Sequence, residues 1–90
     1  GQDQEIRVST YRTEHGAEVD FIVERGSELF AIEVKASRTI GSSDLRGLKR
    51  FGEYAGKKYP SFVFYQGDSK KKIDGIEILP WQEGLRSIGF

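Results

Sequence analysis

Three side chains that can hold a metal ion and act on a phosphate lie close together in the sequence. Asp20 precedes Glu33 by thirteen positions, and Lys35 follows after one further residue. The surrounding segments, residues 19–23 and 30–35, are apolar runs typical of β-strands. Side chains of a strand alternate between its faces, so Glu33 and Lys35 share a face, and a hairpin would bring Asp20 beside them. Two carboxylates and an ammonium group are the minimum for binding a divalent cation and stabilising a reacting phosphate.

This pattern alone does not identify a reaction. At average composition, a Glu-x-Lys with an aspartate ten to fifteen residues upstream arises by chance in roughly one chain of this length in ten. Charged residues are disfavoured in an apolar strand, so Glu33 and Lys35 need compensating partners. One interpretation is a structural ion-pair network with Asp20. In the other, Asp20, Glu33 and the main-chain carbonyl of Val34 bind Mg²⁺, while Lys35 orients or deprotonates the attacking water.

The elements that must position these residues predict a mixed α/β fold. Leu45, Leu48 and Phe51 recur at helical spacing and predict an amphipathic helix over residues 44–55, whose two glycines indicate close packing against a sheet. An apolar strand reached through that crossover helix is expected to run parallel to the third strand. The expected order is βββαββ with a short terminal helix, the strands covering residues 5–12, 18–24, 29–35, 61–65 and 73–79.

The motif and the order of elements resemble the PD-(D/E)xK nuclease superfamily, which has the restriction-endonuclease-like fold. The resemblance is carried by GAEVDFIV at residues 16–23 and AIEVKAS at residues 31–37. With residues 11–13, these segments resemble more narrowly the domain of unknown function at the C-terminal end of AAA-type P-loop ATPases of bacteria and archaea. The resemblance runs over residues 11–66 and continues to Trp81. It implies that Asp20 and Glu33 bind Mg²⁺ or Mn²⁺, that Lys35 is catalytic, and that DNA is cleaved.

Two departures from the family pattern limit this expectation. The family's first helix, which often adds an active-site glutamate and covers one sheet face, has no counterpart before Gln4. There is also no G-x-x-x-x-G-K-[ST] loop, so ATP would act only through an ATPase domain outside this sequence. We therefore expect residues 1–90 to be a single domain, the C-terminal part of a longer ATPase, with little turnover alone. The alternative is a non-catalytic accessory or binding module that retains the nuclease fold.

Composition indicates a soluble domain in a reducing compartment. The sequence has no cysteine, which excludes disulfides and thiolate metal sites and makes the cytoplasm the expected location. It shows neither an apolar run long enough to span a bilayer nor the pattern of a signal peptide, so no membrane partner is expected. The expected partners are DNA and the N-terminal ATPase domain of the same protein.

The charge is balanced overall but divided between the halves. Residues 1–45 carry five basic and nine acidic side chains, and residues 46–90 carry nine and five. Basic side chains of the second half are candidate phosphate contacts, although a solvated turn and helix face explain them equally well. These residues are Arg46, Lys49, Arg50, Lys70, Lys71 and Lys72. Tyr54, Tyr65 and Trp81 occupy apolar positions of their elements, which favours core or rim roles over base stacking.

Overall fold

Six strands and two α-helices make up the described part of the chain in the computed structural model. Described are residues 5–14, 16, 18–55 and 59–89, with the side chain of Tyr54 left out. The elements are β1 (Ile6–Arg12), β2 (Glu18–Arg25), β3 (Glu28–Val34), a 3₁₀ turn η1 (Ser42–Leu45), α1 (Arg46–Ala55), β4 (Ser61–Tyr65), β5 (Lys71–Ile73), β6 (Ile76–Pro80) and α2 (Trp81–Ser87). None of the helices in these residues is long and apolar enough to cross a membrane.

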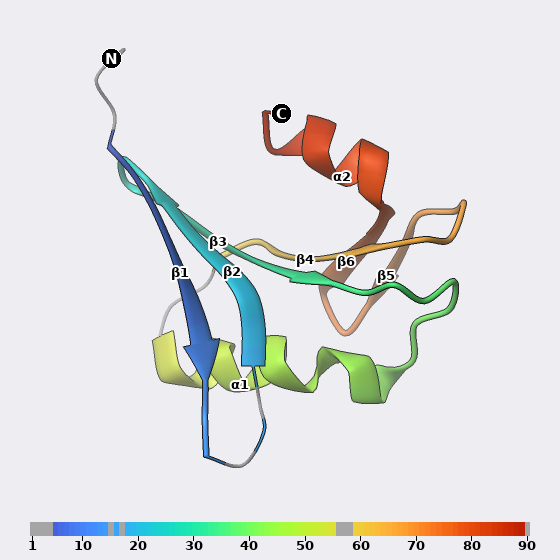
Figure 1. Ribbon diagram of the computed structural model, residues 1–90, viewed down its shortest axis with the longest axis horizontal. Helices are drawn as coiled ribbons and strands as arrows, with labels where there is room; N and C mark the ends of the chain where they lie inside the picture. The colour runs from blue at the N-terminus through green and yellow to red at the C-terminus, as the bar shows by residue number, and fades with distance from the viewer. Residues whose placement is uncertain (1–4, 15, 17, 56–58, 90) are drawn as a thin grey trace.

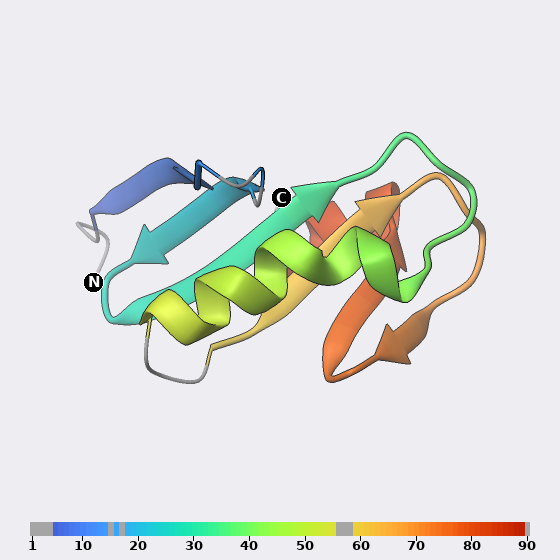
Figure 2. The same ribbon diagram turned by 90° about the horizontal axis from the view of Figure 1, so that it is seen from below.

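The strands form one mixed sheet in the order β1-β2-β3-β4-β6-β5. The first three make an antiparallel meander, after which α1 crosses over so that β4 runs parallel to β3. β6 is again parallel to β4, and β5 pairs with it in the antiparallel sense. Figures 1 and 2 show α1 on one face of the sheet and α2 on the other. The predicted α/β fold class is therefore confirmed.

A hairpin replaces the single last strand that was predicted over residues 73–79. β5 and β6 are joined by Asp74 and Gly75, which have positive φ angles of 53° and 82°. Two-residue loops with positive φ match the right-handed twist of paired strands, and an Asp-Gly pair is one of their strongest sequence signals. Lys71 and Lys72, predicted to lie in an exposed turn, belong to β5.

Two apolar clusters hold the helices against the sheet. The α1-side core, between α1 and the sheet, contains Val19, Ile22, Ala31, Ile40, Leu45, Leu48, Phe51, Val63, Tyr65, Ile76 and Ile78. The α2-side core contains Phe30, Ile32, Phe62, Phe64, Leu79 and Ile88. β4 contributes alternate side chains to both clusters, which explains why its sequence is apolar on both faces.

Gly47 brings the start of α1 into direct contact with β2. A Cβ atom at this position would overlap the main-chain carbonyl of Glu18, two residues before Asp20 in the same strand. The close packing that the helix glycines predict is therefore present at Gly47. At Gly52 the nearest atom to an added Cβ is the Tyr59 hydroxyl at 3.4 Å, an ordinary contact.

We expect Gly47→Ala to lower the free energy of unfolding by about 2 kcal/mol, because the helix must move away from β2. Gly52→Ala is the matched control in the same helix. It should be neutral or stabilising by up to ~1 kcal/mol, since alanine favours the helix. Urea denaturation followed by circular dichroism measures both, and equal midpoints for the two variants would contradict the packing described here.

A candidate metal and phosphate site

The three predicted site residues lie at the ends of two neighbouring strands. Asp20 is in β2, Glu33 is near the end of β3, and Lys35 follows β3 directly. The antiparallel register pairs Phe21 with Ile32, so one more step along both strands brings Asp20 beside Glu33. Glu33 is only 5% exposed, and no other charged residue in the described ranges is buried. The fold therefore brings the two carboxylates together, as the sequence predicts.

A β-bulge in β2 sets the position of Asp20. The register with β1 shifts between the pairs Ser9–Ile22 and Tyr11–Val19, so two β2 residues, Asp20 and Phe21, oppose a single residue of β1. The extra residue also allows Val19 and Ile22, three positions apart, to enter the same α1-side core. Bulges bend a strand and redirect the side chain at the bulged position. Here that side chain is the Asp20 carboxylate.

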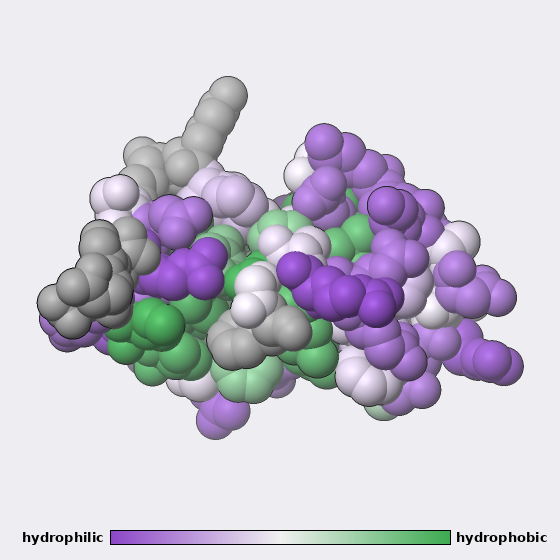
Figure 3. Space-filling view, turned by 90° about the horizontal axis from the view of Figure 1, so that it is seen from above, coloured by the Kyte–Doolittle hydropathy of each residue, from purple (hydrophilic) through white to green (hydrophobic). Residues whose placement is uncertain are grey.

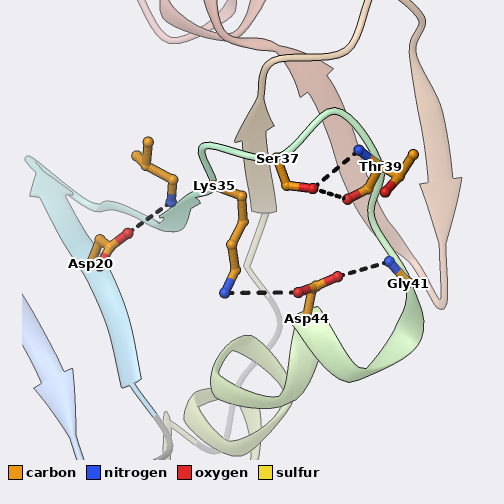
Figure 4. Close-up of polar contacts among 7 residues, drawn as sticks. Asp20, Lys35, Ser37, Thr39, Gly41 and Asp44 are labelled. Carbon is orange, nitrogen blue, oxygen red and sulfur yellow. Dashed lines mark hydrogen bonds and ion pairs between the residues drawn. The ribbon is translucent and has the colours of Figure 1, made fainter.

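The redirected carboxylate caps the end of the β2–β3 ladder. Oδ2 of Asp20 accepts a hydrogen bond from the main-chain N–H of Val34, with an N···O distance of 2.8 Å (Figure 4). In a strand the N–H and C=O of one residue point toward the same edge. The Val34 carbonyl, predicted as a metal ligand, therefore faces the edge on which Asp20 lies.

The carboxyl group of Glu33 has a raised pKa. Burial raises the pKa of its carboxyl group to about 8, and the hydrogen bond with Asp20 and the Asp20 charge contribute further. The charge of Lys35 opposes this rise in the Glu33 pKa, whereas Glu18 adds to it. Two carboxyl groups that hydrogen-bond to each other must share a proton, so near neutral pH the pair carries one proton in the absence of a cation. A divalent cation can replace that proton.

The donor set fits magnesium better than a metal that needs many protein ligands. No group of three or more His, Cys, Asp or Glu side chains suited to a metal occurs among residues 5–14, 16, 18–55 and 59–89. A cation between Asp20 and Glu33 would take two carboxylates, the Val34 carbonyl and water or phosphate oxygens. Mg²⁺ typically uses one or two carboxylates and keeps several waters.

Lys35 contacts an acidic residue that sequence reasoning missed. Its Nζ lies 4.0 Å from Oδ1 of Asp44 in η1, and Oδ2 of Asp44 accepts the N–H of Gly41 at 2.9 Å (Figure 4). Ser37 stabilises the connecting loop, since its Oγ donates to the Thr39 carbonyl at 2.6 Å and accepts the Thr39 N–H at 3.2 Å. An aspartate three residues after Gly41, in the first turn, is a signal for this capping arrangement.

The candidate phosphate contacts are distributed over several elements. Lys71 and Lys72 lie in β5, which β4 and β6 separate from β3. Acidic side chains lie beside Lys49, Arg50 and Lys70, in the pairs Lys49–Asp74 at 2.6 Å, Arg50–Glu53 at 3.6 Å and Lys70–Glu83 at 3.7 Å. Arg46 begins α1, close in sequence to Asp44. A role for these six residues in binding phosphate stays a prediction.

Comparison with known proteins gives a family without an assigned activity. A family model described as a domain of unknown function, DUF4143, matches residues 1–83, which include the whole candidate site. No curated protein matches the chain, and no solved structure matches it.

Proposed function

The chain belongs to the DUF4143 family, and we propose that it is a nuclease-like domain of the PD-(D/E)xK superfamily. In this proposal the domain hydrolyses DNA phosphodiesters with Mg²⁺ or Mn²⁺ as part of a cytoplasmic AAA-type ATPase. The observation that carries it is the position of Asp20 beside the buried Glu33 at adjacent strand ends, with the charge of Lys35 near enough to act on Glu33. A proton shared by two carboxylates marks a place where a cation is favourable.

The topology supports the superfamily assignment. An antiparallel meander carries the aspartate on its second strand and the Glu-x-Lys on its third. The helix that follows returns the chain to a strand parallel to the third. This is the arrangement that the motif predicts, and it places all three polar groups at one end of the central strands.

Each side chain has a distinct role in the proposed reaction. Asp20 and Glu33 would hold the cation, with the Val34 carbonyl as the third protein ligand. The bound cation would lower the pKa of water and polarise the phosphate. Lys35 orients or deprotonates the attacking water and offsets the negative charge that develops on the phosphate. Glu33 must lose its proton for this site to form, so cation binding releases protons.

The test uses the longer protein that contains the ATPase domain, because ATP acts only through that domain. We expect fluorescently labelled DNA to be cut in Mg²⁺ or Mn²⁺ and to remain intact in EDTA, with matched RNA as a second substrate. We expect the isolated 90 residues to turn over slowly or not at all. Absence of cutting by the longer protein in either metal, with or without ATP, would remove the nuclease proposal.

A second candidate function is a non-catalytic module that binds the ATPase domain or a partner. It is favoured by the uneven distribution of exposed apolar side chains. The exposed large apolar side chains in the described ranges lie on the face that carries α2; they are Ile6, Val8, Phe21, Val34, Trp81 and Leu85. Figure 3 views this side and shows hydrophobic side chains gathered between hydrophilic ones.

Strand pairing places these residues on one face. Val8 pairs with Val23, which packs against the α2-side core, and Phe21 pairs with Ile32 of that core. Ile6 lies two positions before Val8 in β1, and Val34 lies two positions after Ile32 in β3. Side chains two positions apart in a strand share a face, so both lie on the α2 side. At the α2 end, Val34, Trp81 and Leu85 line a hollow of about 290 Å³. Trp81 is therefore a rim residue and Tyr65 a core residue, as their apolar positions indicate.

The two candidate functions predict opposite results when Glu33 and Lys35 are substituted. If the domain serves only as a module, the paired substitutions Glu33→Gln and Lys35→Gln leave every activity of the longer protein unchanged, whereas Phe21→Asp on the apolar face releases the partner. If the domain is a nuclease, the paired substitutions abolish cutting. DNA cleavage and co-purification of the separately expressed ATPase domain, measured on the same variants, separate the two.

A further inference from the structure

Asp44 occupies a rigid position at the junction between β3 and α1. One carboxylate oxygen accepts the Gly41 N–H, and the neighbouring Leu45 is fully buried in the α1-side core. Three residues further, Gly47 lies against the backbone of β2. The loop, the core and the helix contact thus hold Asp44 on one side of Lys35, and its second oxygen is directed at the lysine ammonium (Figure 4).

Lys35 lies between acidic groups, with Asp44 on one side of its side chain and Asp20 on the other (Figure 4). Asp44 is 4.0 Å from its Nζ, and Lys35 also interacts electrostatically with Glu33. The lysine side chain is a flexible four-carbon chain ending in a point charge, so it can turn toward either group. Lys35 and Asp44 are only about one-third exposed, at 34% and 35%, which limits screening of their attraction by solvent.

A lysine that turned fully onto the carboxylates would compete with a metal ion. The ammonium would neutralise the charge that attracts a divalent cation and would occupy space between the carboxylate oxygens. Lys35 could then no longer contact the phosphate. An acidic group on the opposite side, fixed by the fold, would oppose both effects.

We propose that Asp44 is a positioning residue that holds the Lys35 ammonium away from the Asp20–Glu33 pair, keeping the carboxylates open to a divalent cation. The inference rests on the proposed function for its consequence, but the position of Lys35 is a property of the chain without metal. Asp44 acts through Lys35 and contacts neither metal nor phosphate. Because partly exposed ion pairs contribute little free energy, removing the Asp44 charge should weaken Mn²⁺ binding by about two- to fivefold.

The test variant is Asp44→Asn, which keeps an oxygen for the Gly41 N–H and removes only the charge. Asp74→Asn is the matched control, since it removes the charge from the Lys49–Asp74 pair in the β5–β6 turn. Lys35→Gln and the double variant Lys35→Gln/Asp44→Asn complete a double-mutant cycle. Crystal structures of the metal-free variants locate the Lys35 Nζ, and Mn²⁺ titration followed by electron paramagnetic resonance gives the affinity.

We expect Lys35 to move toward Asp20 and Glu33 in metal-free Asp44→Asn and to keep its place in Asp74→Asn. Mn²⁺ affinity should fall about two- to fivefold in Asp44→Asn, with no loss when the same change is made in the Lys35→Gln background. A direct attraction between Asp44 and the metal, or a purely structural cap, would give the same loss in both backgrounds and would overturn the inference. So would a lysine that stays in place in Asp44→Asn.

Failure of the proposed function has a different signature. If the wild-type chain binds no Mn²⁺ but Lys35 moves in Asp44→Asn, the positioning role stands and the metal-dependent function does not. If Mn²⁺ binds to Asp20 and Glu33 but Lys35 does not move, the function stands and the role of Asp44 is wrong.

Discussion

Raising the pH from 4.5 to 8 without divalent cations should destabilise the folded chain by on the order of 4 kcal/mol. The Glu33 carboxyl, whose ordinary pKa is 4.5, has a pKa of about 8 in the folded chain. Below pH 4.5 both the folded and unfolded states hold the proton, and the contribution of Glu33 to stability is complete. Between pH 4.5 and 8 the unfolded state loses the proton first, so the free energy of unfolding falls by about 1.4 kcal/mol per pH unit. Above pH 8 both states are ionised and the slope ends.

Glu33→Gln should remove this pH dependence, because the amide does not titrate and can still donate a hydrogen bond to Asp20. Glu53→Gln, in an exposed ion pair with Arg50, is the control and should keep the wild-type slope. Saturating Mg²⁺ should also flatten the slope, since the cation binds the ionised pair and replaces the proton. Urea denaturation at half-unit pH steps measures all four curves. Parallel curves for wild type and Glu33→Gln would show that Glu33 is not the titrating group.

Loss of the lysine should abolish cutting without abolishing metal binding. In the proposed longer protein we expect Lys35→Ala to reduce DNA cleavage by about 10²- to 10⁴-fold, the range found when a proton-transfer or charge-stabilising group is removed. Mn²⁺ affinity should be retained or raised, because a competing cation has been removed from the neighbourhood of the carboxylates. Glu33→Gln should lose both cleavage and metal binding.

The matched control for charge is Arg7→Ala, an exposed cation on the edge strand whose partner is Glu5. It should cleave DNA at the wild-type rate. Single-turnover cleavage with protein in excess, measured beside the Mn²⁺ titrations, separates the chemical step from binding. Equal losses of metal affinity in Lys35→Ala and Glu33→Gln would contradict the separate roles given to these residues.

The sequence predicts the fold because its local signals agree with one another. The alternating strands, the crossover helix and the apolar run at residues 61–65 all favour a mixed sheet, and the structure has it. The adjacent positions of Asp20 and Glu33 follow from strand pairing alone. A hairpin between their segments has few registers that bury the apolar residues.

Other features depend on tertiary packing that one sequence does not encode locally. The bulge at Asp20 and Phe21 exists because Val19 and Ile22 both enter the α1-side core, and no turn residue marks it. Asp44 reaches Lys35 only after the loop between β3 and α1 folds back. The clustering of exposed apolar side chains near α2 likewise becomes visible only with the strand register. The β5–β6 hairpin, by contrast, could have been predicted from the sequence, because the Asp74-Gly75 pair is a signal for a two-residue hairpin loop.

A crystal of the chain soaked in Mn²⁺ near pH 8, with anomalous data, tests the central claim most directly. We expect one strong anomalous peak about 2.1 Å from carboxylate oxygens of Asp20 and Glu33 and from the Val34 carbonyl oxygen, absent in Glu33→Gln. A peak elsewhere, or no peak between Asp20 and Glu33 at millimolar Mn²⁺, would show that the two carboxylates form a structural pair rather than a metal site.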